Sequence, residues 1–149
     1  MRSRVMVLMM AVALCVPRRA IHAQAPTPDV PPVVRAGFDS LKAAGFEAGI
    51  RGWLKGSPVL QAGTPQELTE KLRPVLTAYG DYVGYDVLGT VRIGDHVTRV
   101  YAVVRFALGP LYVFFDCYQS ATGWIVTTFL FNAQPGLILP PEMLRPRAQ

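Results

Sequence analysis

The sequence predicts an α+β fold in which three N-terminal helices pack on a four-stranded antiparallel meander. Between residues 33 and 80 the apolar residues recur at helical spacing, and from residue 82 onward they alternate with a period of two. Turn signals rich in Gly, Pro and Asp divide the second part into four strands. Helices followed by successive hairpins predict one sheet with the helices over one of its faces.

The first 25 residues are expected to be a signal peptide. Arg2 and Arg4 precede the apolar run at residues 5–16, and residues 23–25 (Ala-Gln-Ala) fit the small-x-small pattern of a cleavage site. This run is too short for a membrane-spanning helix, which needs about 20 residues. Cleavage after Ala25 therefore predicts a periplasmic or secreted protein with no membrane span after processing.

Loss of this leader changes the charge and the size of the chain. The remaining 124 residues suit a single domain with a hydrophobic core. The net charge falls from +5 to +1, with 11 Lys and Arg residues against 10 Asp and Glu residues. Because the basic character lies mostly in the leader, we expect no nucleic-acid partner.

The mature chain keeps one cysteine, Cys117, and one histidine, His96. No intramolecular disulfide can form, and a zinc site lacks the second histidine or thiol that it would need. A Ser-His-Asp triad would depend on His96, which lies in an expected surface turn. We therefore expect no metal and no cofactor. A lipoprotein anchor at Cys15 is the alternative to simple cleavage, but the bulky Leu14 stands where a small residue is expected.

A Pro-rich spacer at residues 26–32 leads into the predicted domain at residues 33–133. Apolar residues at helical spacing predict the first two helices: Val34, Phe38 and Leu41, then Phe46, Ile50, Trp53 and Leu54. The third helix opens with a capping box, residues 64–67 (TPQE), which puts proline at the first helical position. Gly80 should end this helix, and Pro74 should kink it.

The four strands are predicted at residues 82–93, 97–108, 111–119 and 124–132, and a Pro-rich tail follows at residues 134–149. A two-residue Gly-Pro turn after the second strand would place Arg105 opposite Phe114. A four-residue loop ending at Gly123 would place Asp116 opposite Thr127. In the tail, three consecutive aliphatic residues (137–139) could dock on the body of the domain.

This register divides the sheet into two faces, because side chains alternate along a strand. The almost wholly apolar face is expected to pack against the helices; it carries Val100, Ala102, Val104, Phe106, Val113, Phe115, Cys117, Val126 and Leu130. The other face carries Arg99, Tyr101, Arg105, Tyr112, Phe114, Asp116, Tyr118, Thr127, Phe129 and Phe131. So many aromatic side chains should be covered by a second subunit, a curled part of the chain or a ligand. A homodimer is the commonest of these solutions.

Asp116 is the first candidate for catalysis. In this register it lies diagonally across from Arg105, within reach of an ion pair that would lower the pKa of its carboxyl group. We expect a neutralised charge at the edge of an interface; the alternative is a general base whose pKa is raised by its aromatic surroundings. Its neighbour Cys117 should point into the apolar face and be inert.

A second cluster lies where the third helix leads into the first strand. Tyr79, Tyr82 and Tyr85 occur there with Asp81 and Asp86. The ordinary interpretation is that aromatic residues favour strands and acidic residues favour strand ends. Alternatively, their hydroxyl and carboxylate groups line the mouth of a pocket between helix and sheet, with Tyr82 and Asp86 as catalytic candidates.

The order of these elements resembles small exported bacterial members of the nuclear transport factor two-like superfamily. The resemblance covers residues 33–133 and includes the ending G-W-x-V-x-x-F-x-F at residues 123–131. It implies a cone-shaped α+β barrel whose bent sheet wraps over the helices. The superfamily includes ketosteroid isomerase-like and polyketide cyclase-like enzymes as well as binding and dimerising proteins, and no enzyme subfamily's catalytic pattern maps onto this chain.

The expected function is an exported, non-catalytic domain that forms a homodimer or binds a small apolar ligand. The candidate ligand or interface residues are Tyr79, Tyr85, Arg105, Tyr112, Phe114, Tyr118, Phe129 and Phe131. One alternative is a small isomerase, cyclase or lyase with Asp116 or Asp86 as base and a tyrosine as hydrogen-bond donor. Another is an envelope accessory protein that binds a second protein through the aromatic face.

Overall fold

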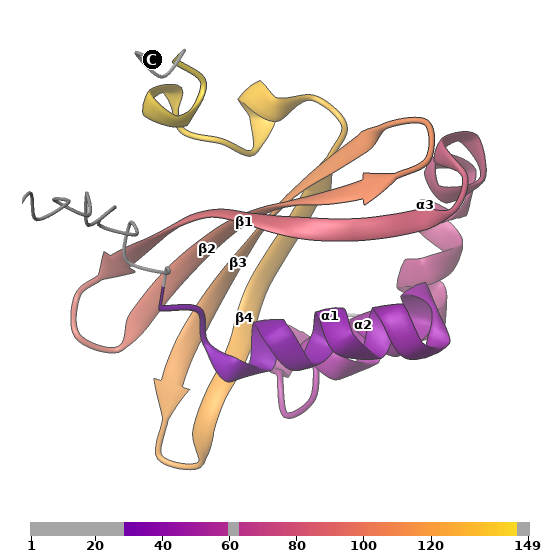
Figure 1. The fold of residues 1–149 in the computed structure, drawn as a ribbon. Coiled ribbons are helices and arrows are strands. Elements are labelled where there is room, and N and C mark those ends of the chain that lie inside the picture. The colour runs from indigo at the N-terminus through magenta and orange to yellow at the C-terminus, as the bar shows by residue number, and fades with distance from the viewer. Residues whose placement is uncertain (1–28, 60–62, 146–149) are drawn as a thin grey trace, which may run out of the picture.

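The computed structural model describes residues 29–59 and 63–145, which form helices, a sheet and two short 3-10 helices (Figure 1). The helices are α1 (Pro32–Ala44), α2 (Phe46–Trp53) and α3 (Pro65–Tyr79), and the strands are β1 (Tyr82–Ile93), β2 (Val97–Phe106), β3 (Pro110–Ser120) and β4 (Gly123–Asn132). The strands form one antiparallel sheet in the order β1-β2-β3-β4. The predicted α+β class, with three helices and a four-stranded antiparallel sheet, is confirmed. The predicted leader lies outside the described residues.

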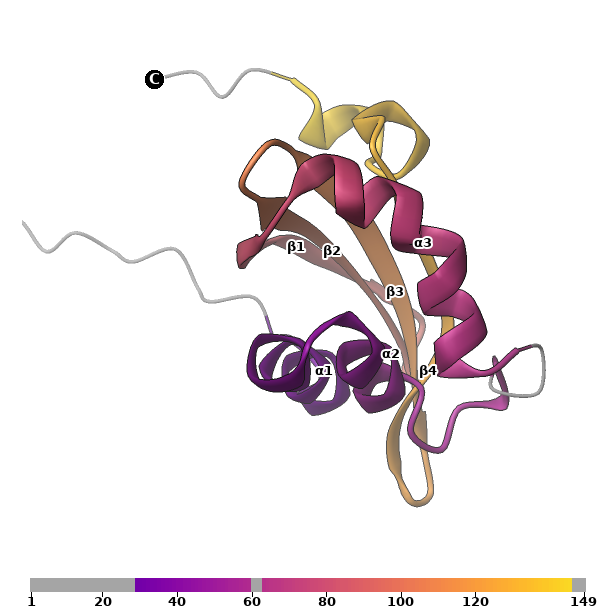
Figure 2. The same ribbon diagram turned by 90° about the vertical axis from the view of Figure 1, so that its right-hand side faces the viewer.

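Helices α1 and α2 lie side by side and are joined at Gly45, whose φ of 84° is in the left-handed region that favours glycine (Figure 2). Their close approach depends on Gly37 in α1. A Cβ atom at this position would overlap the indole ring of Trp53 in α2. Trp53 is fully buried, and its Nε1 donates a hydrogen bond to the carbonyl oxygen of Val34 over 3.1 Å. The indole therefore joins the two helices from inside the core.

Helix α3 begins at the predicted capping box. The Thr64 hydroxyl accepts a hydrogen bond from the Glu67 amide (3.2 Å), and the Glu67 carboxylate accepts one from the Thr64 amide (2.7 Å). The helix continues through Pro74 to Tyr79. Its apolar residues are only partly buried against the core. At its end, the carbonyl oxygen of Tyr79 accepts a hydrogen bond from the Leu108 amide (2.9 Å), which ties the helix to the turn between β2 and β3.

The main core lies between the helices and one face of the sheet, here called the inner face; the opposite side is the outer face. The helices contribute Val34, Phe38, Leu41, Ile50, Trp53 and Leu54 to this core, and the strands contribute Val100, Ala102, Val104, Phe106, Leu111, Val113, Phe115, Cys117 and Val126. The predicted inner face is therefore confirmed, except at Leu130. Figure 2 shows the sheet curving around the helices.

The pairing of β2 with β3 differs from the predicted register. The turn occupies residues 107–109, so Arg105 pairs with Pro110 and not with Phe114. Along the strands, Arg99 pairs with Asp116. The prediction assumed a two-residue turn and was wrong by four positions. Because four is an even number, every side chain of β2 and β3 still lies on its predicted face.

A β-bulge changes the faces of β4. Cys117 pairs with Val126 as predicted, but Asp116 pairs with Thr128 rather than with Thr127. The extra residue reverses the alternation beyond it. Phe129 and Phe131, predicted on the outer face, therefore lie on the inner face, where they are partly buried against the main core. Leu130, predicted on the inner face, lies on the outer face and is 49% exposed.

Alanine substitutions should distinguish the two sides of β4 beyond the bulge. Phe131→Ala should lower the free energy of unfolding by about 2–3 kcal/mol, less than a fully buried phenylalanine because Phe131 is half-buried. Its ring lies 6.0 Å from the rings of Phe46 and Trp53, contacts that alanine cannot make. Leu130→Ala should change stability by less than about 1 kcal/mol. Urea unfolding measures the free energy of unfolding of both variants. A larger loss for Leu130→Ala than for Phe131→Ala would mean that the bulge is absent.

The C-terminal segment covers part of the outer face. After β4 the chain forms two 3-10 helices, Pro135–Leu137 and Pro141–Met143 (Figure 1). Ile138 and Leu139 between them are buried in a second cluster that also contains Tyr101, Leu88, Tyr112, Phe114 and Met143. The sequence predicted that a second subunit, a curled part of the chain or a ligand covers the aromatic face. In the structure a part of the chain, the C-terminal segment, covers some of it. Leu137, which was expected to dock with its neighbours, is exposed instead.

Candidate functional site

Asp116 forms an ion pair on the outer face, but with a different arginine from the predicted one. Its two carboxylate oxygens accept hydrogen bonds from Nε and Nη2 of Arg99, over 2.6 and 2.7 Å. The Arg99 guanidinium lies over the Phe114 ring, 4.4 Å from its centroid. Hydrogen bonding to the carboxylate raises the pKa of Arg99 above its ordinary value. Both oxygens of Asp116 are thus engaged by a permanent cation.

Asp86, the second candidate base, also contacts an arginine. Its Oδ2 lies 2.9 Å from Nε of Arg105, and both side chains are about half exposed. Ion pairs in such solvated positions contribute little to stability. The predicted pairing of Arg105 with Asp116 is therefore wrong, because the shift in register moves Arg105 to the opposite end of β2 from Asp116.

Cys117 is fully buried in the main core, as predicted. Burial, with a smaller contribution from the Asp116 carboxylate, raises the pKa of its thiol to about 12. The nucleophilic thiolate is therefore scarce at neutral pH.

This burial predicts slow alkylation and a defined pH dependence. Cys117 in the folded protein should not react with iodoacetamide at pH 8, whereas Cys117 in urea should react readily. The unfolded thiol loses its proton near pH 9 and the folded one near pH 12, so stability should fall as the pH rises between these values. Comparison with Cys117→Ala isolates this contribution from the tyrosines. Rapid labelling of the folded protein would contradict the buried position.

The tyrosine cluster forms a pocket of about 380 Å³ at the start of β1. It is lined by Lys42, Tyr82, Val83, Gly84, Tyr85 and Arg105. The sequence had singled out Tyr82, Tyr85 and Arg105, and the structure brings them together. Lys42, from the last turn of α1, was missed because a lysine at a helix end is an ordinary surface residue.

Backbone irregularity shapes this β1 pocket. A register shift between Tyr82 and Gly84 leaves Val83 as an extra residue, so Tyr82 and Tyr85 both point toward the helices. The Tyr85 ring stacks on Phe38 at a centroid distance of 3.8 Å, which fixes its orientation. Burial raises the pKa of the Tyr82 phenol, so its hydroxyl stays protonated at neutral pH.

The other predicted site residues lie elsewhere. Tyr79 packs near Phe106, with ring centroids 6.3 Å apart. Tyr112 and Phe114 pack against the C-terminal segment. Tyr118 is exposed on the outer face beyond that segment. The predicted interface set is therefore divided between the main core, the β1 pocket and the outer face.

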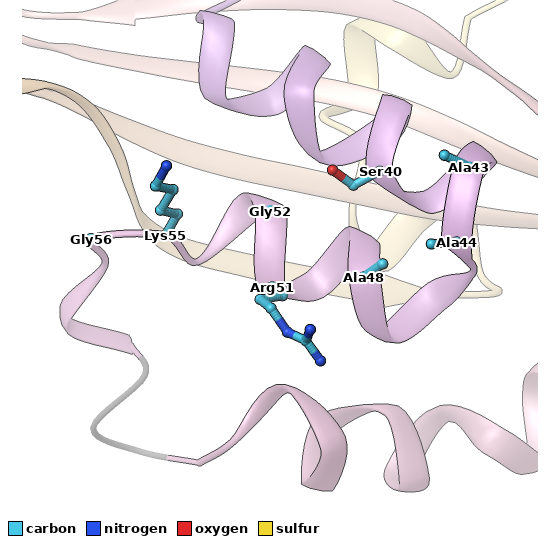
Figure 3. Close-up of a pocket in the computed structure, with 8 residues that line it drawn as sticks. All are labelled: Ser40, Ala43, Ala44, Ala48, Arg51, Gly52, Lys55 and Gly56. Atoms are coloured by element: carbon cyan, nitrogen blue, oxygen red, sulfur yellow. The ribbon is translucent and has the colours of Figure 1, made fainter.

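A groove of about 680 Å³ lies on the surface of α1 and α2 (Figure 3). It is lined by Ser40, Ala43, Ala44, Ala48, Arg51, Gly52, Lys55 and Gly56. Arg51 is paired with Glu47 at 2.5 Å. Small side chains leave this groove wide and place few polar groups in it, so it holds no set of groups suited to acid–base chemistry.

Within residues 29–59 and 63–145, no group of three or more His, Cys, Asp and Glu side chains could hold a metal ion. None of the described helices is long and apolar enough to cross a bilayer. No protein-family model, curated protein or solved structure matches this chain.

Proposed function

We propose that this chain is an exported, non-catalytic domain of the nuclear transport factor two-like superfamily, with a cone-shaped fold, that binds a small molecule and forms a homodimer. The order of three helices and four strands supports this assignment. The curvature of the sheet around α1 and α2 in Figure 2 supports it further.

The ligand-binding part of the proposal depends on one observation, the β1 pocket. Its volume of about 380 Å³ lies within the range of small-molecule sites, about 300–1,000 Å³. Polar groups from α1, β1 and β2 reach it, while aromatic rings behind them hold the tyrosines in place. A pocket with a few convergent polar groups on rigid elements is the usual form of a binding site.

The non-catalytic part depends on the two acidic candidates. A base for proton abstraction at neutral pH works best when its pKa is raised and its oxygens are free to reach the substrate. Asp116 accepts two hydrogen bonds from Arg99, and Asp86 contacts Arg105. Each carboxylate is therefore held by a guanidinium group rather than free to approach a substrate. Both contacts therefore favour binding over catalysis.

The dimer part depends on the portion of the outer face that the C-terminal segment leaves open. Val91, Ile93, Tyr118 and Leu130 are exposed there, around the paired charges of Arg99 and Asp116. Because the ion pair is neutral within one chain, two copies of this apolar surface can meet without repulsion between like charges. A two-fold interface needs such self-complementarity.

Native mass spectrometry of protein purified from its own host tests the ligand-binding part and the dimer part. We expect a dimer that carries a bound small molecule. Leu130→Lys should give monomers, whereas Leu108→Lys, in the β2–β3 turn where this side chain is 77% exposed, should leave the dimer intact. A monomer at micromolar concentration in sedimentation experiments would contradict the dimer. Turnover of a ketosteroid or enolisable probe that is lost in Asp116→Asn or Asp86→Asn would contradict the non-catalytic part.

A further inference from the structure

The donor groups of the β1 pocket define a ligand class. We propose that the pocket binds the anionic head group, a carboxylate or a phosphate, of a small amphipathic molecule. This inference rests on the proposed ligand-binding function and adds the chemistry of the ligand.

The polar side chains that line the pocket are dominated by hydrogen-bond donors. They belong to Lys42 of α1, Tyr82 and Tyr85 of β1, and Arg105 of β2. Lysine and arginine side chains can only donate, and a protonated phenol donates readily to an anion. Oxygen atoms of a carboxylate or a phosphate supply the acceptors that such a set requires.

Arg105 reaches the pocket because residue 84 is a glycine. A Cβ atom on Gly84 would lie 2.9 Å from Nη2 of Arg105, so the guanidinium lies across the strand where a side chain would otherwise stand. Asp86 contacts the Nε side of the same group, at 2.9 Å. This contact orients the guanidinium and leaves its terminal amino groups, one of which lies beside Gly84, to donate into the pocket. Arginine held in this way suits paired recognition of an oxyanion.

The charged groups around the β1 pocket indicate that an anion would be held by hydrogen bonds to individual donors rather than by a net positive charge. The pocket has two cations, Lys42 and Arg105. Two acids act against them: Asp86 contacts Arg105, and the negative charge of Asp39 contributes to the raised pKa of Tyr82. The four charges sum to zero. Affinity for an anion therefore comes from the convergent donors, and removal of Asp39 should increase it.

A cavity beside the β1 pocket offers a surface on which the apolar part of the ligand can pack. A second cavity of about 420 Å³ shares Val83 and Arg105 with the β1 pocket and continues along Phe106, Ala107, Gly109 and Pro110. Val83 is 59% exposed between the two cavities. A ligand with its anionic group at Arg105 and its apolar body beside Val83 and Pro110 would cover this surface, which is apolar and otherwise in contact with water.

Titration of the ¹⁵N-labelled protein with four probes tests the proposal by NMR. The probes are benzoate, phenyl phosphate, inorganic phosphate and the neutral benzyl alcohol. We expect benzoate or phenyl phosphate to shift the amide signals of Gly84, Tyr85 and Arg105. The stronger of the two identifies the head group. Inorganic phosphate should bind more weakly than phenyl phosphate, and benzyl alcohol at least tenfold more weakly than benzoate.

Variants separate the contributions of the individual groups. Arg105→Gln and Lys42→Gln should each weaken binding of the preferred anion at least tenfold, and Asp39→Asn should strengthen it. Lys55→Gln removes a cation from the groove on α1 and α2 and should have no effect. Thermal unfolding of every variant identifies any loss of binding that comes from loss of the fold.

Three results would overturn the ligand class. Benzyl alcohol could bind as well as benzoate, inorganic phosphate could bind as well as phenyl phosphate, or none of the anions could shift the pocket signals at millimolar concentration. The small molecule retained in native mass spectrometry decides the broader proposal separately. A neutral retained molecule would refute the anionic class while supporting ligand binding, and a protein that retains no molecule and binds no probe would refute both.

Discussion

Gly37→Ala should lower the free energy of unfolding of this domain more than a glycine-to-alanine substitution at any other position in α1 or α2. The new Cβ would occupy the position of the Trp53 indole, and neither α1 nor the fully buried ring has room to move. Over-packing of a close helix contact costs about 3 kcal/mol when the backbone must shift. The shift would also strain the hydrogen bond from the indole to Val34, at 3.1 Å. Urea unfolding monitored by tryptophan fluorescence measures the loss.

Gly136→Ala is the matched control for this substitution. Gly136 has open space where its Cβ would be added, and its φ lies outside the left-handed region. The change should therefore be neutral or slightly stabilising, since alanine restricts the unfolded chain. Equal stability of the two variants would mean that α1 and α2 do not meet at Gly37.

Leu139→Asp should release the C-terminal segment from the outer face. Leu139 is 7% exposed in the second cluster, and an unpaired carboxylate is costly to bury there. We expect a loss of about 2–4 kcal/mol, limited by the free energy that holds the segment in place. The rest of the domain should stay folded, because the main core lies on the other face. Tyr101, Tyr112 and Phe114 would then be exposed to water.

Leu137→Asp provides the control within the same segment. Leu137 is 62% exposed, so the same substitution should change stability by less than about 0.5 kcal/mol. Binding of the dye ANS and cleavage by a protease near residue 138 should rise for Leu139→Asp alone. Equal responses of the two variants would contradict the docking of this segment.

The regular parts of the fold were predictable because they follow from local spacing. The capping box, the glycine stops and the change of period from helix to strand are properties of neighbouring residues. The faces of β2 and β3 were also predicted correctly although the register was wrong by four, since an even error preserves the alternation. The faces of β4 beyond Thr127 were not predicted, because nothing in its sequence marks the bulge.

The candidate site could be predicted only in part, for a related reason. Tyr82 and Tyr85 were recognisable as aromatic residues near a helix–strand junction, and Arg105 as a charged residue on the aromatic face of the sheet. Lys42 is 40 positions from Tyr82 in sequence and joins the pocket only because α1 ends beside the irregular start of β1. That Asp116 pairs with Arg99 and not with Arg105 likewise follows from the length of the β2–β3 turn. Contacts between distant segments are set by tertiary geometry, which the local pattern does not contain.

The bulge in β4 also determines where this strand can gain or lose a residue during evolution. Thr127 is the unpaired residue between Val126 and Thr128, and its hydroxyl donates to the Asp116 carbonyl oxygen over 3.2 Å. Deletion of Thr127 would join two residues that already face consecutive partners, so Phe129 and Phe131 would keep their places in the core. Deletion of a residue after the bulge, such as Leu130, would bring Phe131 to the outer face. Thr127 is therefore the site in β4 at which a family of related sequences could vary in length while keeping the same core.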